Sequence, residues 1–150
     1  MNKTVVFILF IVTCVALGAL SGVSNQPGAW YQSLNKPFFN PPSWIFAPVW
    51  TVLYGMIGGA LAATWYDENN TRRLQIFAVQ AVLNLIWSPA FFGLQSPLLG
   101  LVIIVPLLIS ILLFIAASWQ PNRWAAWLFV PYAAWVAFAT LLNLAIVLLN

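Results

Sequence analysis

Long apolar stretches separated by polar breaks make up most of this chain. A helix needs about 20 mostly apolar residues to cross the hydrocarbon core of a membrane. Stretches of about that length cover residues 4–22, 43–66, 72–93, 96–119 and 123–148. The breaks are short except the first, over residues 23–42. The pattern predicts an all-α membrane protein: a five-helix transmembrane bundle forming a single domain over residues 1–150.

The first break and the start of the second stretch are rich in aromatic residues and proline. Residues 30–54 read WYQSLNKPFFNPPSWIFAPVWTVLY. A lipid-buried helix does not begin with so many prolines, because proline fixes φ and lacks an N–H group. The composition suits a stiff loop that lies at the membrane surface and caps a ligand pocket.

Prolines also fall within the predicted spans. Pro97 suits the first turn of a helix. Each of the others is expected to kink its helix or to mark a local break, which packed membrane bundles tolerate; they are Pro48, Pro89, Pro106 and Pro131.

The first apolar stretch has two interpretations. A short basic start, an apolar stretch and small residues near 21–24 also describe a signal peptide. The stretch is as long as a full span, however, and its removal would leave four spans with the same apolar faces. We therefore expect it to be retained as a span.

Composition and charge agree with a membrane protein. Hydrophobic residues make up 63% of the chain and charged residues 5%, whereas soluble domains have about a quarter of their residues charged. The basic residues are too few and too scattered for nucleic-acid binding. Lys3, Arg72, Arg73 and Arg123 belong to one side of the predicted topology and Lys36 to the other. This bias predicts a cytoplasmic N-terminus, with the long first loop and the C-terminus outside.

The missing residue types exclude several chemistries. The chain has no histidine, which rules out a histidine metal site and a histidine-based catalytic triad. Cys14 is alone, so no intrachain disulfide forms. No carboxylate lies within a span, which argues against an ion-coupled transporter, a cation channel and a proton pump. No cofactor or metal is expected.

The third stretch has one polar and aromatic face. At about 100° per residue, Gln80, Asn84, Trp87, Ser88 and Phe91 fall within an arc of roughly 100°. Polar groups in lipid are costly, so this face must point into the bundle. It serves either interhelical hydrogen bonding or the wall of a pocket, and the helix alone does not decide between them.

The fifth and second stretches present further aromatic faces. Trp135 lies too deep for the interfacial belt and is either a core residue or a pocket floor. Asn143 lies off this face and is interpreted as structural. Trp50 and Tyr54 lie one turn apart, beside a Gly55–Gly59 pair that permits close helix approach within the bundle or between subunits. Together with the loop, these faces indicate a mostly apolar cavity with few polar groups, suited to a flat hydrophobic ligand.

These residues resemble the TspO/MBR family of tryptophan-rich sensory proteins and translocator proteins. The resemblance covers nearly the whole chain. Its first part rests on Trp30-Tyr31, Leu34, Lys36-Pro37, Pro41-Pro42, Trp44, Phe46, Pro48, Trp50, Leu53-Tyr54, Met56 and Gly58. Its later parts rest on Asn84, Trp87, Pro89, Phe91-Phe92-Gly93, Pro131-Tyr132, Trp135, Phe138-Ala139-Thr140 and Leu142-Asn143.

The resemblance implies a five-helix membrane protein that is usually a homodimer and binds porphyrins, other tetrapyrroles and flat hydrophobic drugs. It also implies a pocket among helices one, two, three and five, under the first loop. Carried onto this chain, the ligand-binding residues are Tyr31, Pro41, Trp50, Asn84, Trp87, Phe91, Trp135 and Ala139.

Cholesterol binding is not expected. Animal members of the family carry a Tyr and then an Arg after the Leu-Asn near the C-terminus. Here the corresponding stretch, residues 144–150, has neither. The departure favours a bacterial source.

Three functions remain open. The first is a tetrapyrrole-binding sensor, regulator or transporter. The second is an enzyme that degrades porphyrin in light and oxygen, with Trp50 and Trp135 taking part. The third is a structural or partner-regulating membrane protein whose pocket is incidental.

Overall fold

The computed structural model describes residues 2–150 and is built almost entirely of helices. Their order is α1 (Lys3–Ser24), α2 (Ala29–Ser33), the 3₁₀ turn η1 (Ser43–Ile45), α3 (Phe46–Trp65), α4 (Thr71–Ser88), the π-helical turn η2 (Pro89–Gly93), α5 (Pro97–Ser118) and α6 (Arg123–Leu149). Five of these segments are long and apolar enough to cross a membrane. The five-helix fold class is therefore confirmed, with boundaries close to those predicted.

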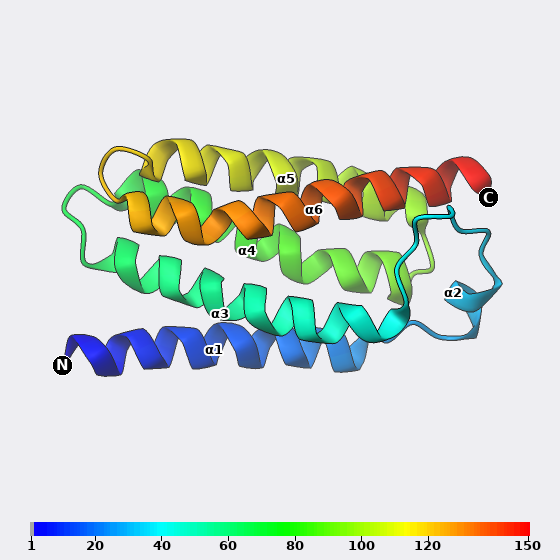
Figure 1. Cartoon of the computed structure of the whole chain (residues 1–150), viewed down its shortest axis with the longest axis horizontal. Helices are drawn as coiled ribbons and strands as arrows, with labels where there is room; N and C mark the ends of the chain where they lie inside the picture. The colour runs from blue at the N-terminus through cyan, green and yellow to red at the C-terminus, as the bar shows by residue number, and fades with distance from the viewer. Residues whose placement is uncertain (1) are drawn as a thin grey trace.

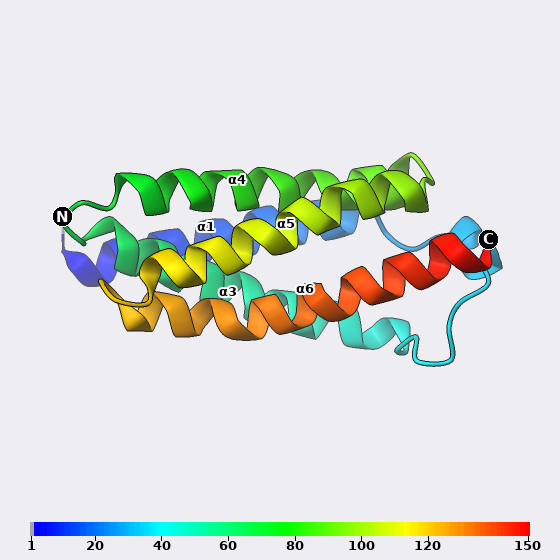
Figure 2. The same ribbon diagram turned by 90° about the horizontal axis from the view of Figure 1, so that it is seen from above.

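The long helices run side by side in one bundle (Figure 1). Neighbours follow the order α1, α3, α6, α5, α4, and α4 closes the arrangement by a looser approach to α1 and α3. Residue 2 and residue 150 lie at opposite ends, as an odd number of spans requires. Viewed from above, α4 and α6 lie on opposite sides of α5 (Figure 2).

Side-chain caps explain where three helices begin. The side chains of Asn2, Ser96 and Asn122 accept hydrogen bonds from the backbone N–H groups of Thr4, Leu99 and Ala125, at 3.0, 3.2 and 3.2 Å. Each cap satisfies an N–H that has no partner inside its own helix. The short polar breaks in the sequence thus act as helix starts.

The prolines behave in two ways. Pro89 ends the regular α-helix of α4 and begins η2, so the predicted local break is found there. Pro48 instead lies in the first turn of α3, because the preceding residues form η1, so its placement deep in a span was wrong. Pro106 and Pro131 lie inside α5 and α6, which continue past them.

Glycine permits a close crossing between α1 and α3. A Cβ on Gly58 would lie 2.6 Å from Ile11 Cα, and a Cβ on Gly18 would overlap the ring of Tyr54. A Cβ on Gly59 would meet Leu128 at an ordinary 3.5 Å, and one on Gly55 would meet no described residue within 4 Å. The close contact of α3 with α1 is therefore made at Gly58 and not at the Gly55–Gly59 pair.

The long loop packs over one end of the bundle and is tied to the end of α6. Asn35 N–H donates to Asn150 Oδ1 at 3.0 Å, and Asn150 Nδ2 donates to Asn35 O at 2.9 Å. Phe39 in the loop packs edge-on against Phe138 of α6 at 6.1 Å between ring centroids. The loop thus covers the bundle end formed by α6, η2 and the start of α3.

Candidate functional site

A chain of hydrogen bonds crosses the middle of the bundle. Tyr54 Oη of α3 donates to Asn84 Oδ1 at 2.6 Å, and Asn84 Nδ2 of α4 donates to Tyr132 Oη of α6 at 2.6 Å. Tyr132 Oη in turn donates to Gln80 Oε1 at 2.9 Å. Every hydroxyl and the Asn84 amide have a partner, which removes most of the cost of placing them in lipid.

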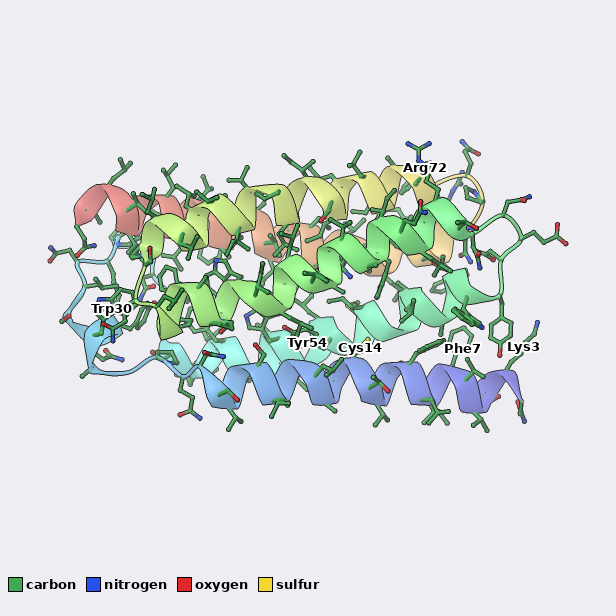
Figure 3. All side chains as sticks on the ribbon, turned by 180° about the vertical axis from the view of Figure 1, so that it is seen from behind. Lys3, Phe7, Cys14, Trp30, Tyr54 and Arg72 are labelled. Carbon is green, nitrogen blue, oxygen red and sulfur yellow. The ribbon has the colours of Figure 1, made fainter. Side chains whose placement is uncertain are left out.

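An open cavity of about 220 Å³ lies beside this chain, between α1, α3 and α4. Thr13, Cys14 and Leu17 of α1 form one wall, and Figure 3 shows Cys14 and Tyr54 between α1 and α3. Gln80 and Asn84 of α4 line it as well. The cavity is mostly apolar with a few polar groups, a composition typical of small-molecule sites.

Gln80 leaves a hydrogen-bond donor free at this cavity. Its side chain is 1% exposed, and within residues 2–150 no group accepts from Nε2. A buried unpaired donor costs about 1–3 kcal/mol. A ligand with a carbonyl or carboxylate oxygen would recover that cost by accepting from Gln80 Nε2.

A second group of aromatic residues lies under the loop. Trp87 stacks on Phe91 at 5.1 Å and 25°. Tyr31 is buried and packs edge-on against Phe91 and Phe92, at 6.3 and 5.4 Å. Trp87 Nε1 donates to Asn143 Oδ1 at 3.2 Å, and Asn143 Nδ2 donates to Pro97 O at 2.8 Å. Asn143 thus holds the Trp87 ring in place and joins α6 to the start of α5, which is the structural role predicted for it.

Tyr31 also holds the loop through a hydrogen bond and a cation–π contact, in addition to its packing. Its hydroxyl donates to Asn40 Oδ1 at 3.2 Å, and the Lys36 ammonium lies over its ring at 4.7 Å. Burial raises the pKa of the Tyr31 phenol, and the hydrogen bond to Asn40 offsets part of that rise. The phenol therefore stays neutral and able to donate at physiological pH.

Trp50 and Trp135 lie between α3 and α6. Trp50 packs against Tyr54 at 5.5 Å and against Tyr132 at 6.3 Å. Trp135 packs against Phe46 at 6.0 Å and Phe138 at 5.6 Å. The Trp135 Nε1 atom is buried, and no described residue accepts its hydrogen. It is a second free donor on the ligand-facing side predicted from the sequence.

The predicted site residues thus fall into four positions. Asn84 lines the open cavity, while Tyr31, Trp87 and Phe91 form the cluster under the loop. Trp50, Trp135 and Ala139 pack against the central core, and Pro41 is half-buried just before η1. No residue of α6 lines the open cavity, because the rings of Trp50, Trp135, Phe46 and Phe138 occupy the space between α3 and α6.

Sequence reasoning missed two contributors, Tyr132 and Cys14. Tyr132 lies one turn before Trp135 and beside Pro131, a polar ring deep in an apolar span, and that position was a usable signal. The position of Cys14 gave no such signal in the sequence, because a lone cysteine in an apolar helix is ordinarily a small core residue.

The geometry defines an integral, multi-pass membrane protein with a cavity beside a hydrogen-bonded chain inside the bundle and an aromatic cluster under its first loop. Residues 10–149 match the TspO/MBR family. The tryptophan-rich protein TspO of Chlorobaculum tepidum is 45% identical over 157 aligned residues, covering 100% of this chain and 99% of that protein. The chain therefore belongs to the TspO/MBR family.

Other relatives come from all domains of life. The tryptophan-rich protein TspO of Archaeoglobus fulgidus is 46% identical, covering 81% of this chain and 80% of its own length. The human translocator protein is 35% identical, covering 85% of this chain and 80% of its own length.

Proposed function

We propose that this protein binds porphyrins and related flat hydrophobic molecules, and acts as a sensor, regulator or transporter of them. The observation that carries the proposal is the cavity beside the Tyr54–Asn84–Tyr132–Gln80 chain, with the free donor Gln80 Nε2 at its side. Aromatic rings offer flat surfaces for stacking, and the free donors suit carboxylate oxygens at the edge of a tetrapyrrole. The names of relatives, tryptophan-rich sensory protein and translocator protein, agree with such a role.

Binding of a tetrapyrrole requires the cavity to enlarge. Its 220 Å³ is below the roughly 300–1,000 Å³ of typical small-molecule sites. The loosest helix contact around it is that between α1 and α4. We propose that α1 moves away from α4 to admit the ligand from the membrane, while the rings of Trp50 and Trp135 rotate to extend the site toward α6.

The test is a titration of protoporphyrin IX into the purified protein in detergent, in the dark, following quenching of tryptophan fluorescence. We expect saturable quenching that Trp135→Phe weakens several-fold and that the control Trp65→Phe, an exposed tryptophan at the far end of α3, leaves unchanged. Protoporphyrin should also slow alkylation of Cys14, the only thiol, because Cys14 lines the cavity. Absence of saturable quenching would end the tetrapyrrole assignment.

The second candidate function is light- and oxygen-dependent degradation of the porphyrin. The row of oxidisable rings Trp50, Tyr54 and Tyr132, in contact at 5.5 and 6.3 Å, favours it. The bound porphyrin would be the photosensitiser and dioxygen the oxidant. Loss of porphyrin absorbance under illumination that Trp50→Phe or Trp135→Phe abolishes would support this function, whereas unchanged porphyrin would leave binding alone.

The proposed setting is a bacterial cell membrane, with residue 2 on the cytoplasmic side and residue 150 outside, and a homodimer as the assembly. The charges support the orientation. Lys3, Arg72, Arg73 and Arg123 belong to the first turns of α1, α4 and α6, which start at one end of the bundle. Lys36 follows α2, which lies at the other end (Figure 1).

A further inference from the structure

A second hollow lies at the other end of the bundle, away from the loop. It is a groove of about 370 Å³ on the outer side of α3, between α1 and α6, which we call the α1–α6 groove. Its lining residues are Lys3, Phe7, Gly59, Ala63, Tyr66, Asn122, Trp124 and Leu128. None of them belongs to the predicted ligand site.

The depth of the groove comes from small residues on α3. Gly59 and Ala63 lie one turn apart, and a Cβ on Gly59 would meet Leu128 only at 3.5 Å. Phe7 of α1 stacks on Tyr66 with ring planes 4° apart and forms one side, while Leu128 of α6 forms the other. The inner part of the groove is therefore apolar and runs along the helices.

The outer end of the groove is positive. Lys3 Nζ lies over the Tyr66 ring at 5.2 Å, and no carboxylate within residues 2–150 forms an ion pair with it. Figure 3 shows Lys3 and Phe7 on the first two turns of α1. The first turn of α6 lies at the same end, where the helix dipole adds partial positive charge.

The nearby acids do not cancel this charge. Asp67 is held by Arg73 Nη1 at 2.8 Å and by Asn122 Nδ2 at 2.8 Å. Glu68 is exposed in the turn after α3 and lines no part of the groove. Trp124 is 76% exposed at the rim, a position typical of the aromatic belt at headgroup level.

We propose that the α1–α6 groove binds one anionic phospholipid, with an acyl chain along Gly59 and Ala63 and the phosphate at Lys3. An apolar groove with a single cation at its end, at the membrane boundary, fits an amphiphile with a negative head and a long tail. A helix of a second copy fits less well, since it would bury the Lys3 ammonium without a partner.

The test uses native mass spectrometry of the full chain in detergent, titrated with phosphatidylglycerol and with phosphatidylcholine of the same acyl chains. We expect one phosphatidylglycerol to bind about fivefold more tightly, the effect of one basic residue near an anionic headgroup. Lys3→Gln should remove that preference. Arg72→Gln is the matched control, because Arg72 carries the same charge at the same end but lies away from α1 (Figure 3).

A second pair of variants tests the apolar part of the groove. Gly59→Leu should lower binding of both lipids, whereas Gly55→Leu, one turn earlier on α3 and outside the groove, should not. Ala63→Leu replaces Gly59→Leu if the latter does not fold. Equal binding of the two lipids, or a preference that survives Lys3→Gln, would overturn the proposal. So would displacement of the lipid by inorganic phosphate alone, or a dimer whose formation Gly59→Leu abolishes without any bound lipid.

Discussion

At the scale of single residues, the bundle is organised around polar groups that lipid cannot satisfy. The sequence placed Gln80 and Asn84 on an inward face and left hydrogen bonding and pocket wall open as alternatives. Both hold, since Asn84 bonds Tyr54 and Tyr132 and also lines the cavity. The partners could not be predicted, because they depend on the rotation of three helices about their axes.

This chain of hydrogen bonds makes a prediction about stability. Tyr132→Phe leaves Asn84 Nδ2 and Gln80 Oε1 without their partner in the middle of the bundle. We expect it to lower the free energy of unfolding by about 1–2 kcal/mol, measured by denaturation in detergent. Tyr66→Phe, at a ring 38% exposed, is the control and should have little effect. Equal stability of the two variants would mean that the chain contributes nothing measurable.

At the scale of helices, close packing depends on which glycine faces which neighbour. The sequence favoured Gly55 and Gly59, but the closest approach to α1 is at Gly58, and Gly59 lines the α1–α6 groove. Four small residues fall within five positions of α3, so several faces of this helix would permit close approach of a neighbour. Periodicity alone cannot choose among them, whereas the helix boundaries followed directly from apolar length and capping residues.

The glycine contacts predict opposite effects for two similar changes. Gly58→Ala places a Cβ 2.6 Å from the Ile11 backbone and should destabilise the protein by about 1–3 kcal/mol. Gly55→Ala meets no described residue and should be neutral or stabilise by up to about 1 kcal/mol, because alanine favours the helix. Thermal unfolding in detergent compares the two. A Gly58→Ala protein as stable as Gly55→Ala would contradict the tight α1–α3 crossing.

At the scale of the whole molecule, the five-span topology could be predicted and the shape of the cavity could not. Spans follow from apolar length, which is a property of the sequence alone. The cavity depends on how large rings share the space between helices: Trp50 and Trp135 fill the α3–α6 side, and the opening is left toward α1 and α4.

The proposed orientation is tested with single cysteines in a Cys14→Ser background. Gln32→Cys lies in the loop and Glu68→Cys in the α3–α4 turn, both exposed and at opposite ends. In intact bacteria, a membrane-impermeant maleimide should label the first and not the second. Permeabilised cells should label both. The reverse pattern in intact cells would invert the topology.

The pairing of Asn35 with Asn150 has a practical consequence for how the protein is handled. Two hydrogen bonds join the loop to Asn150, so a segment added after Asn150 would lie beside the loop that covers the bundle end. A purification tag there would crowd the backbone that holds the loop in place and would alter the apparent affinity for a ligand. Tags placed before Lys3 would lie at the far end but close to the α1–α6 groove. Ligand assays therefore call for a tag at the N-terminal end, and lipid assays for a tag at the C-terminal end.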